Sequence, residues 1–279
     1  MKYASIKDLR SYLGFHPIGV KGELLGSGDG STRTFYTKYK PLVDFDYDGQ
    51  ILDDVTAKID GEPAAIEAID EATGKIVLQD APSGGSQITV DYYWHPFGDR
   101  ELQSVIEAAE AEIDNECARS FEKREYVERF LLTRGNTFAV GNTPLIEVKY
   151  IKVYTVGREL VEELKPGDYI FSPNGIVELK KYCAGVPVKP WYLPLQLLIE
   201  IKYVGGYDPI PAIVSHTTIL IAAYRLLLKI SSLMATEPEY QDKITLAFKK
   251  PEEITKRLEY LRTEIENAKR ILPHRVVMI

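Results

Sequence analysis

Apolar and polar residues alternate with two different periods along this chain. Between Gly26 and Trp94, short runs alternate every second residue and are separated by turn residues, which predicts β-strands; these runs are RTFYTKY, VTAKID, KIVL and ITVDYYW. From Asp99, a suitable N-cap, the spacing changes to four and three, as in an amphipathic helix. Its apolar positions are Leu102, Ile106, Ala109, Ile113 and Cys117. A second strand-rich stretch runs from Phe130 to Val204, so the pattern predicts an α+β fold.

Two further helices are predicted after the second strand-rich stretch. The run after Pro211, AIVSHTTILIAAYRLLLKISSLM, is apolar almost all round and must be buried in a helical bundle or an assembly. The last helix has Pro251 in its first turn and stops at Pro273. It carries a heptad-like stripe that needs a helical partner, in the same chain or in another copy. The stripe is Ile254, Leu258, Leu261, Ile265, Ala268 and Leu272.

The two strand-rich stretches share an order of short motifs. PLVDF at Pro41 corresponds to PLIEV at Pro144, and VTAKIDG corresponds to IKVYTVG. TGKIVL and ITVDY in the first stretch correspond to NGIVEL and IEIKY in the second. One β-meander design is therefore expected twice, by duplication or by the chance similarity of short sheets.

Composition and charge exclude several classes of protein. The chain has 279 residues, enough for roughly two domains or one elaborated domain, and a net charge of −7. Its basic residues occur singly or in isolated pairs, so no stripe that could bind phosphates tightly is expected. Two cysteines are too few for a disulfide scaffold, and no secretory signal is visible at the start, which favours residence in a cytoplasm. Arg225 and Lys229 interrupt the most apolar helix, so no membrane span is expected.

Sequence motifs of the common enzyme classes are absent. The chain has no Gly-x-Ser-x-Gly elbow, no His-Glu-x-x-His and no phosphate loop ending in Gly-Lys-Ser or Gly-Lys-Thr. Each of the four histidines lacks a partner at a spacing typical of a site. We therefore expect no catalytic residues and no required cofactor.

The loop DFDYDGQILDD suggests one metal site. Asp44, Asp46 and Asp48 take the first, third and fifth positions of an EF-hand-type loop, and Gly49 takes the sixth. The twelfth position is Val55 instead of an acid, and the flanks are expected to be strands. A shortened loop could use Asp54 as its closing ligand. The residues thus allow a structural Ca²⁺ site or an exposed acidic loop.

Aromatic residues in the first strand-rich stretch suggest a second class of function. Five side chains could stack on sugar rings, as in a carbohydrate-binding or adhesive β module, or could form half-buried sheet surface. They are Tyr36, Tyr39, Tyr92, Tyr93 and Trp94.

The order of these parts resembles a known family. A short element SIKDLRSYL, a helix ending in NECARSF, then PLIEVKYIKVY, GDYIFSPNGIVEL and the junction GGYDPIPAIV before an apolar helix are similar to the head-tail connector proteins of tailed bacteriophages and related viruses, also called adaptor or head-completion proteins. The similarity covers residues 1–15 and 99–235, and the stretch from Gly19 to Phe97 departs from the compact family pattern.

The resemblance implies a structural virion protein without catalysis. Members form a ring, usually of twelve copies, at the head-tail interface beneath the portal protein and above a neck, stopper or tail protein, and DNA passes through the channel. Such a chain would be assembled in the host cytoplasm. A monomer with its own three-helix core is the alternative that the apolar helices leave open.

The resemblance also gives expected domain boundaries. Residues 1–18 and 98–279 would form a helical-bundle connector core with a β segment at 130–204, and residues 19–97 would be an inserted β domain. Residues 274–279 would form a C-terminal arm. We expect the last-helix residues Ile254, Leu258, Leu261 and Ile265, and the arm residues Val276, Val277, Met278 and Ile279, to lie at an interface.

Overall fold

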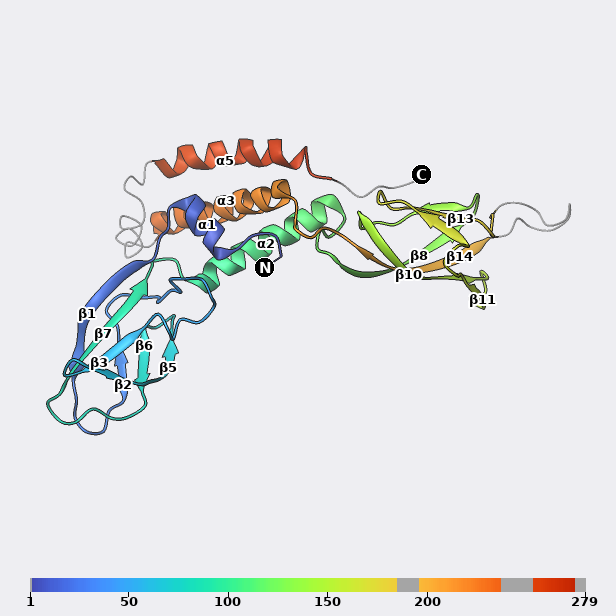
Figure 1. Ribbon diagram of the computed structural model, residues 1–279. Coiled ribbons are helices and arrows are strands. Elements are labelled where there is room, and N and C mark those ends of the chain that lie inside the picture. Colours follow the sequence, from blue (N-terminus) through green and yellow to red (C-terminus); the bar gives the residue numbers. More distant parts are fainter. Residues whose placement is uncertain (1, 185–195, 237–252, 274–279) are drawn as a thin grey trace, which may run out of the picture. The chain divides into compact units, whose positions relative to one another are not determined.

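The computed structural model describes residues 2–184, 196–236 and 253–273 and is a mixture of helices and antiparallel sheets (Figure 1). This confirms the predicted α+β class. The chain divides into two compact units. The first contains Tyr3–Glu110 and His216–Arg270, and the second contains Ala111–Ser215 and the C-terminal residues from Ile271. Residues 274–279, including the expected arm interface, lie outside the described residues.

The first unit begins with helix α1, Ile6–Leu13. The Ser5 side chain accepts from the backbone of Asp8, and the Asp8 carboxylate accepts from the backbone of Ser5, so the two residues form a capping box. Gly14 ends the helix with a φ of 76°, the left-handed conformation that glycine adopts without a steric cost.

Seven strands follow in the first unit. They are β1 (Ile18–Ser27), β2 (Thr34–Tyr36), β3 (Thr56–Ile59), β4 (Glu62–Ala64), β5 (Ile66–Asp70), β6 (Lys75–Leu78) and β7 (Gln87–Trp94). They form two sheets, with strand orders β1-β7-β3-β4 and β2-β6-β5. Side chains from both sheets share one apolar core, which includes Phe35, Ile76, Ile88 and Val90. The predicted inserted domain, 19–97, spans these strands.

The second unit contains another seven strands. They are β8 (Arg124–Leu132), β9 (Thr137–Ala139), β10 (Leu145–Tyr154), β11 (Leu160–Glu163), β12 (Tyr169–Phe171), β13 (Ile176–Leu179) and β14 (Leu197–Gly205). Their sheets have the orders β11-β10-β14-β8 and β12-β13-β9 and share a core that includes Phe138, Ile151, Val177 and Ile199. The strands therefore begin six residues before the predicted segment, 130–204.

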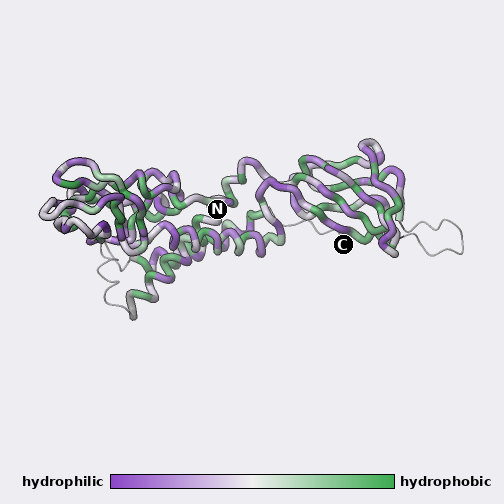
Figure 2. The backbone as a smooth tube through the Cα atoms, turned by 90° about the horizontal axis from the view of Figure 1, so that it is seen from below, coloured by the Kyte–Doolittle hydropathy of each residue, from purple (hydrophilic) through white to green (hydrophobic). Residues whose placement is uncertain are grey.

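The two sandwiches have the same topology. Adding seven to each strand number of the first unit turns the order β1-β7-β3-β4 into β8-β14-β10-β11 and the order β2-β6-β5 into β9-β13-β12. An apolar-polar alternation is visible along the strands of both (Figure 2). The repeat predicted from the four pairs of motifs is therefore present in the fold. It is not the expected β-meander, because strands far apart in the chain order are neighbours, such as β1 with β7 and β2 with β6.

Three longer helices are described. They are α2 (Asp99–Cys117), α3 (Ala212–Thr236) and α5 (Glu253–Lys269). The five apolar positions predicted for α2 are all buried, which confirms its inward face. In α3 most residues between Thr217 and Ile230 are buried. By length and composition α3 could cross a bilayer, but 56% of its apolar window is buried inside the chain, as in the core helix of a globular protein.

The stripe on α5 is covered within the chain. Ile254, Leu261 and Ile265 are buried, and Leu258 is half-buried. In Figure 1, α5 runs alongside α3, and Arg257 on α5 donates from Nη2 to the backbone oxygen of Tyr12 in α1 at 3.0 Å. The stripe thus has a partner in its own chain, and its use between copies stays a prediction.

Candidate functional site

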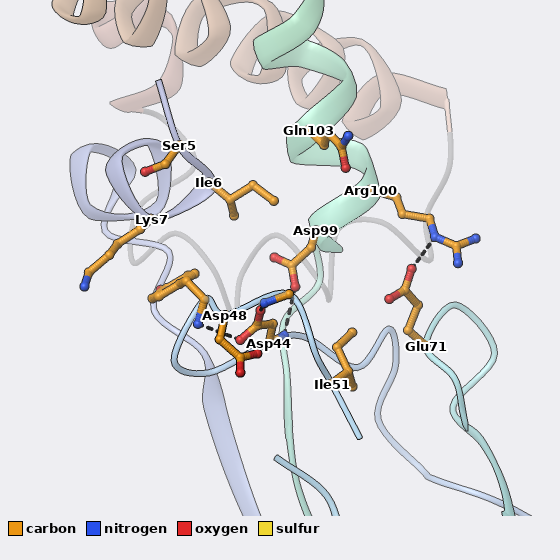
Figure 3. A pocket seen from close by; sticks show the side chains of 12 residues that line it. Ser5, Ile6, Lys7, Asp44, Asp48, Ile51, Glu71, Asp99, Arg100 and Gln103 are labelled. Atoms are coloured by element: carbon orange, nitrogen blue, oxygen red, sulfur yellow. Dashed lines mark hydrogen bonds and ion pairs between the residues drawn. The ribbon is translucent and has the colours of Figure 1, made fainter. Parts of the chain in front are cut away.

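A cavity of about 530 Å³ lies in the first unit, where α1, the loop after β2 and the start of α2 come together (Figure 3). Charged side chains of both signs line it: Lys7, Asp44, Asp48, Glu71, Asp99 and Arg100. Arg100 forms an ion pair with Glu71, and Arg10 forms one with Asp99, so the charges of Lys7, Asp44 and Asp48 remain for the rest of the cavity. Two of these three side chains are carboxylates, which favours a cationic occupant over an anionic one.

The Asp44 carboxylate organises the acidic loop. This side chain is buried, and its two oxygens accept from the backbone N–H groups of Tyr47 and Gly49, each at 2.6 Å. Tyr47 and Gly49 both have positive φ, 68° and 94°. The carboxylate therefore accepts the hydrogen bonds of two backbone amides in a tight turn. Glycine at the sixth loop position allows this turn, because it adopts positive φ without a steric cost.

The other carboxylates of the loop also bind backbone. Asp46 Oδ1 accepts from Asp48 N at 3.1 Å, and Asp48 Oδ1 accepts from Gln50 N at 2.7 Å. The carboxylate oxygens of Asp44, Asp46 and Asp48 still lie within 4.8 Å of one another, a spacing that a single cation could bridge. The structure therefore brings together the three alternating aspartates that the sequence singled out.

Asp54, the expected closing ligand, is used differently. Its Oδ2 accepts from Phe45 N at 2.6 Å, and it does not belong to the group of three carboxylates. Burial raises the pKa of Asp54, and the neighbouring carboxylates of Asp46 and Asp44 raise it further. Asp54 thus ties the two ends of the loop together. Binding of calcium by this loop stays a prediction.

Arg10 connects the loop to two helices. The Arg10 guanidinium is fully buried and donates to Asp99 Oδ1 from Nε at 3.2 Å and from Nη2 at 2.8 Å. The second oxygen of Asp99 accepts from Asp44 N at 2.9 Å. Asp99 is therefore a shared anchor for α1, α2 and the acidic loop, a role that sequence analysis missed because it assigned Asp99 only to helix capping.

Among the histidines that the structure describes, only His95 is buried, and local contacts hold it. His95 Nδ1 lies 3.1 Å from the backbone nitrogen of Phe97, which donates to it, and the His95 ring lies 5.0 Å from that of Phe15. Burial lowers the pKa of His95 to about 3, and nearby Arg10 adds to this effect. A neutral ring packed between aromatic rings has a structural role.

The aromatic residues considered for sugar binding are mostly packed inside the first unit. Tyr92 and Trp94 are buried, and Tyr39 stacks on Trp94 with a centroid distance of 4.7 Å. Tyr93 stacks on Phe45 at 4.1 Å. Only Tyr36, of the five, is largely exposed, so these residues do not form an open stacking platform.

Exposed aliphatic side chains on the second sandwich were not singled out from the sequence. Val127 and Leu131 on β8, and Leu160 and Val161 on β11, are about half exposed. The alternation in REYVERFLL could have indicated an outward apolar position on β8.

Comparison with known proteins gives no matching family model and no matching curated protein sequence. Chains in three solved structures of gene transfer agent (GTA) particles are similar to part of this chain. One, in the neck of an empty GTA particle computed with C6 symmetry, is 18% identical with a TM-score of 0.35 and covers 45% of this chain and 64% of its own length.

The other two chains give similar values. The chain in the virion of a native GTA particle is 20% identical with a TM-score of 0.33 and covers 45% of this chain and 64% of its own. The chain in the neck of a native GTA particle computed with C12 symmetry is 19% identical with a TM-score of 0.32, and the match covers 45% of this chain and 69% of that one. This chain therefore spans less than two thirds of the length of the first two. Likeness at these scores carries no functional assignment.

Proposed function

We propose that this chain is a structural protein of a tailed-virus virion and forms an oligomeric adaptor ring at the head-tail interface. Its neighbours would be a portal protein on one side and a neck, stopper or tail protein on the other, and DNA would pass through the ring without tight binding. No catalytic activity and no required cofactor form part of the proposal. The observation that carries it is the order of parts in residues 99–235, namely helix, sandwich, glycine junction and apolar helix.

The glycine junction is the most specific of these parts, and its local structure explains why these residues are needed. A Cβ on Gly205 would lie 2.3 Å from the backbone oxygen of Asn142, and one on Gly206 would lie 2.3 Å from that of Glu122. Gly206 also has a φ of 99°. Only glycine fits where β14 leaves the sheet at this close approach of backbones.

Tyr207 completes the junction. Its backbone nitrogen donates to the backbone oxygen of Phe121 at 2.8 Å, and its ring stacks on that of Phe121 with centroids 6.3 Å apart. These contacts fix the path from β14 toward α3 against the segment that follows α2. The sequence GGYDPIP thus has a defined structural task in the module whose order of parts resembles the connector family.

Surface composition of the second sandwich also supports an assembly. Exposed aliphatic side chains occur on β8, β11 and the hairpin of β12 and β13, where Ile170 is 53% exposed. On β8 and β11 these side chains lie at the two outer strands of a sheet, where a neighbouring chain could cover them.

The alternative is a carbohydrate-binding or adhesive virion module built on the first sandwich. The packing of Tyr39, Tyr92 and Trp94 inside that sandwich makes this alternative the weaker one. A glycan array probed with the full chain distinguishes the two functions, because specific glycan binding would favour the adhesive module.

The decisive experiment for the adaptor proposal is negative-stain electron microscopy of the purified chain, alone and mixed with portal rings of its own virus. We expect rings, or attachment of this chain to one face of the portal ring. Compact monomers that ignore the portal at every concentration would contradict the proposal.

A further inference from the structure

The sheet β11-β10-β14-β8 of the second unit carries an ordered row of charges on the face turned away from its core. The strand registers place Lys152 opposite both Glu163 and Glu200, and Glu200 opposite Arg129. Read across the four strands, the signs alternate from Glu163 on one edge to Arg129 on the other.

Direct contacts hold this row together. Arg129 Nη2 lies 2.7 Å from Glu200 Oε2, and Lys152 Nζ lies 3.9 Å from Glu163 Oε2. The two central residues, Lys152 and Glu200, have opposite charges on both sides. The two end residues have a neighbour on one side only: the Arg129 side chain is 71% exposed and that of Glu163 is 56% exposed.

A neighbouring row on the same face is apolar. Tyr154 lies opposite both Leu160 and Leu198, and Leu198 lies opposite Leu131. The two end residues of this row, Leu131 on β8 and Leu160 on β11, are each 56% exposed. Both edges of the sheet thus present one apolar and one charged side chain, and the charges have opposite signs.

Both edges are open in the part of the chain that the structure describes. β8 and β11 are the outer strands of their sheet, and no described strand pairs with the far side of either. The equivalent edges of the first sandwich are blunted. There β4, the counterpart of β11, contains Pro63, which cannot donate a hydrogen bond. β1, the counterpart of β8, has two register shifts, whereas β8 pairs with β14 without any. Since the topology is the same, the difference lies in residues that block or permit strand addition.

We propose that β8 of one copy pairs antiparallel with β11 of a second copy, which joins their sheets into one. Leu131 would face Leu160 of the second copy, and Arg129 would face Glu163 of the second copy. The two pairs are compatible with one register. Leu131 and Arg129 are two residues apart on β8, whereas Leu160 and Glu163 are three apart on β11, and β11 already contains this extra residue where it pairs with β10. The charged row then continues with alternating signs, and the apolar row continues with leucine against leucine.

The strand directions agree with this pairing. Neighbouring strands in the sheet are antiparallel throughout, so a strand added beyond β8 in the same pattern runs opposite to β8. Within one copy β11 already runs opposite to β8, so β11 of a second copy in the same orientation has the required direction. The two edges differ, so the contact is heterologous and repeats from copy to copy, closing a ring or extending as a filament. That the contact closes a ring rests on the proposed function.

Cysteine cross-linking tests the register directly. Within one copy Leu131 and Leu160 are separated by three strand spacings, roughly 14 Å, which is beyond the roughly 7 Å that a disulfide can bridge. A chain with Leu131→Cys, Leu160→Cys and Cys183→Ser can therefore form this disulfide only between copies. We expect a ladder of linked copies on a non-reducing gel, collapsing to one band on reduction.

A matched control uses Val127, which is 55% exposed on the same face of β8. A chain with Val127→Cys, Leu160→Cys and Cys183→Ser places the two thiols four residues out of register. It should give no ladder. Equal ladders from both chains, or none from the Leu131 chain, would overturn the proposed pairing.

Charge exchange gives an independent test that misfolding cannot imitate. Arg129→Glu places acid against Glu163 of the second copy, and Glu163→Arg places base against Arg129, so either variant alone should assemble at least about tenfold more weakly by analytical ultracentrifugation. An equimolar mixture of the two variants can alternate around the assembly, with every contact again of opposite sign. Recovery to near wild-type assembly in the mixture is expected, and a mixture as weak as its parts would count against the contact.

The outcomes separate this inference from the proposed function. Rings seen by microscopy without the cysteine ladder would leave the adaptor ring standing and reject this contact. A ladder with open filaments instead of rings, even with portal present, would support the contact and reject the closed adaptor ring. Monomers without a ladder would reject both.

Discussion

Arg10 and Asp99, 89 residues apart in the sequence, form a two-point hydrogen-bonded ion pair at 3.2 and 2.8 Å in the first unit. The same guanidinium donates to the backbone oxygens of Phe15 and Phe97 at 3.2 and 2.9 Å. Arg10 therefore has a partner for Nε and for both terminal nitrogens, which is the condition under which a fully buried charge is tolerated.

Replacing Arg10 should destabilise the protein strongly. Arg10→Met keeps much of the side-chain volume but leaves Asp99 and two backbone oxygens without their donor, so we expect a loss of about 3–5 kcal/mol in the free energy of unfolding measured by urea denaturation. Arg33→Met is the matched control, because Arg33 pairs with Glu67 at the surface and should cost less than about 1 kcal/mol. Equal costs for the two variants would contradict this account of Arg10.

Calcium should stabilise the protein if the three aspartates bind it. A metal held only by the native state raises the melting temperature by mass action, so we expect a rise on adding millimolar Ca²⁺. The variant with Asp44, Asp46 and Asp48 changed to Asn should lose this rise, while Asp53→Asn, at an exposed acid outside the group, should keep it. An unchanged melting temperature in the wild type would end the calcium hypothesis.

The glycine in the hairpin between β5 and β6, and its counterpart between β12 and β13, should be indispensable. Gly74 and Gly175 occupy the corresponding motifs TGKIVL and NGIVEL, with φ values of 68° and 87°. A Cβ would lie 2.1 Å from Thr37 Oγ1 at Gly74 and 2.5 Å from Thr143 Cγ2 at Gly175. Alanine at either position therefore adds a steric clash to the backbone cost of about 1–2 kcal/mol.

Substitution of Gly135 measures the backbone cost without the steric clash. Its φ is 78°, but an added Cβ would meet nothing within 4 Å. We expect Gly175→Ala to lose at least about 1 kcal/mol more than Gly135→Ala in chemical denaturation. Should the two losses be the same, close packing at the hairpin would not be the reason for glycine there.

His95 should make the folded state less stable in mild acid. Burial lowers its pKa from 6.5 to about 3 in the folded state, so the unfolded state binds more protons between these values. The stability contributed by neutral His95 is complete above pH 6.5 and is lost progressively as the pH falls toward 3. Its share of the loss approaches about 1.4 kcal/mol per pH unit.

The His95→Gln variant should remove this dependence. Between pH 7 and 5 its free energy of unfolding should fall by about 2 kcal/mol less than that of the wild type. His16→Gln, at an exposed histidine, should keep the wild-type slope. A His95→Gln slope equal to that of the wild type would show that another group titrates in this range.

Removal of residues 274–279 tests the expected C-terminal arm. These residues lie outside the described ones, and their run Val276, Val277, Met278 and Ile279 is typical of a strand added to another protein. We expect the truncated chain to keep its melting temperature as a monomer and to lose ring or portal attachment in a sedimentation assay. A drop of several degrees in the melting temperature would place the arm in the protein's own core. Unchanged attachment would show that the arm lies outside the contact.

Most elements could be predicted from the sequence because their signals are local. The period of two between Gln87 and Trp94 gave β7, and the spacing of four and three from Asp99 gave α2 with its buried face. The repeated motifs predicted one β design twice, since each motif fixes a turn or strand end and both stretches keep the same order. The alternating Asp44, Asp46 and Asp48 were likewise visible, because backbone turns of a short loop bring nearby carboxylates together.

What only the tertiary structure decided depends on residues far apart in the chain. The partner of the α5 stripe lies in the same chain, and the Asp99 carboxylate at the start of α2 binds both Arg10 and the backbone of Asp44. The row from Glu163 through Lys152 and Glu200 to Arg129 exists only because pairing across four strands sets one register. A shift by one residue would turn each of these side chains to the other face, so no local pattern could have revealed the row.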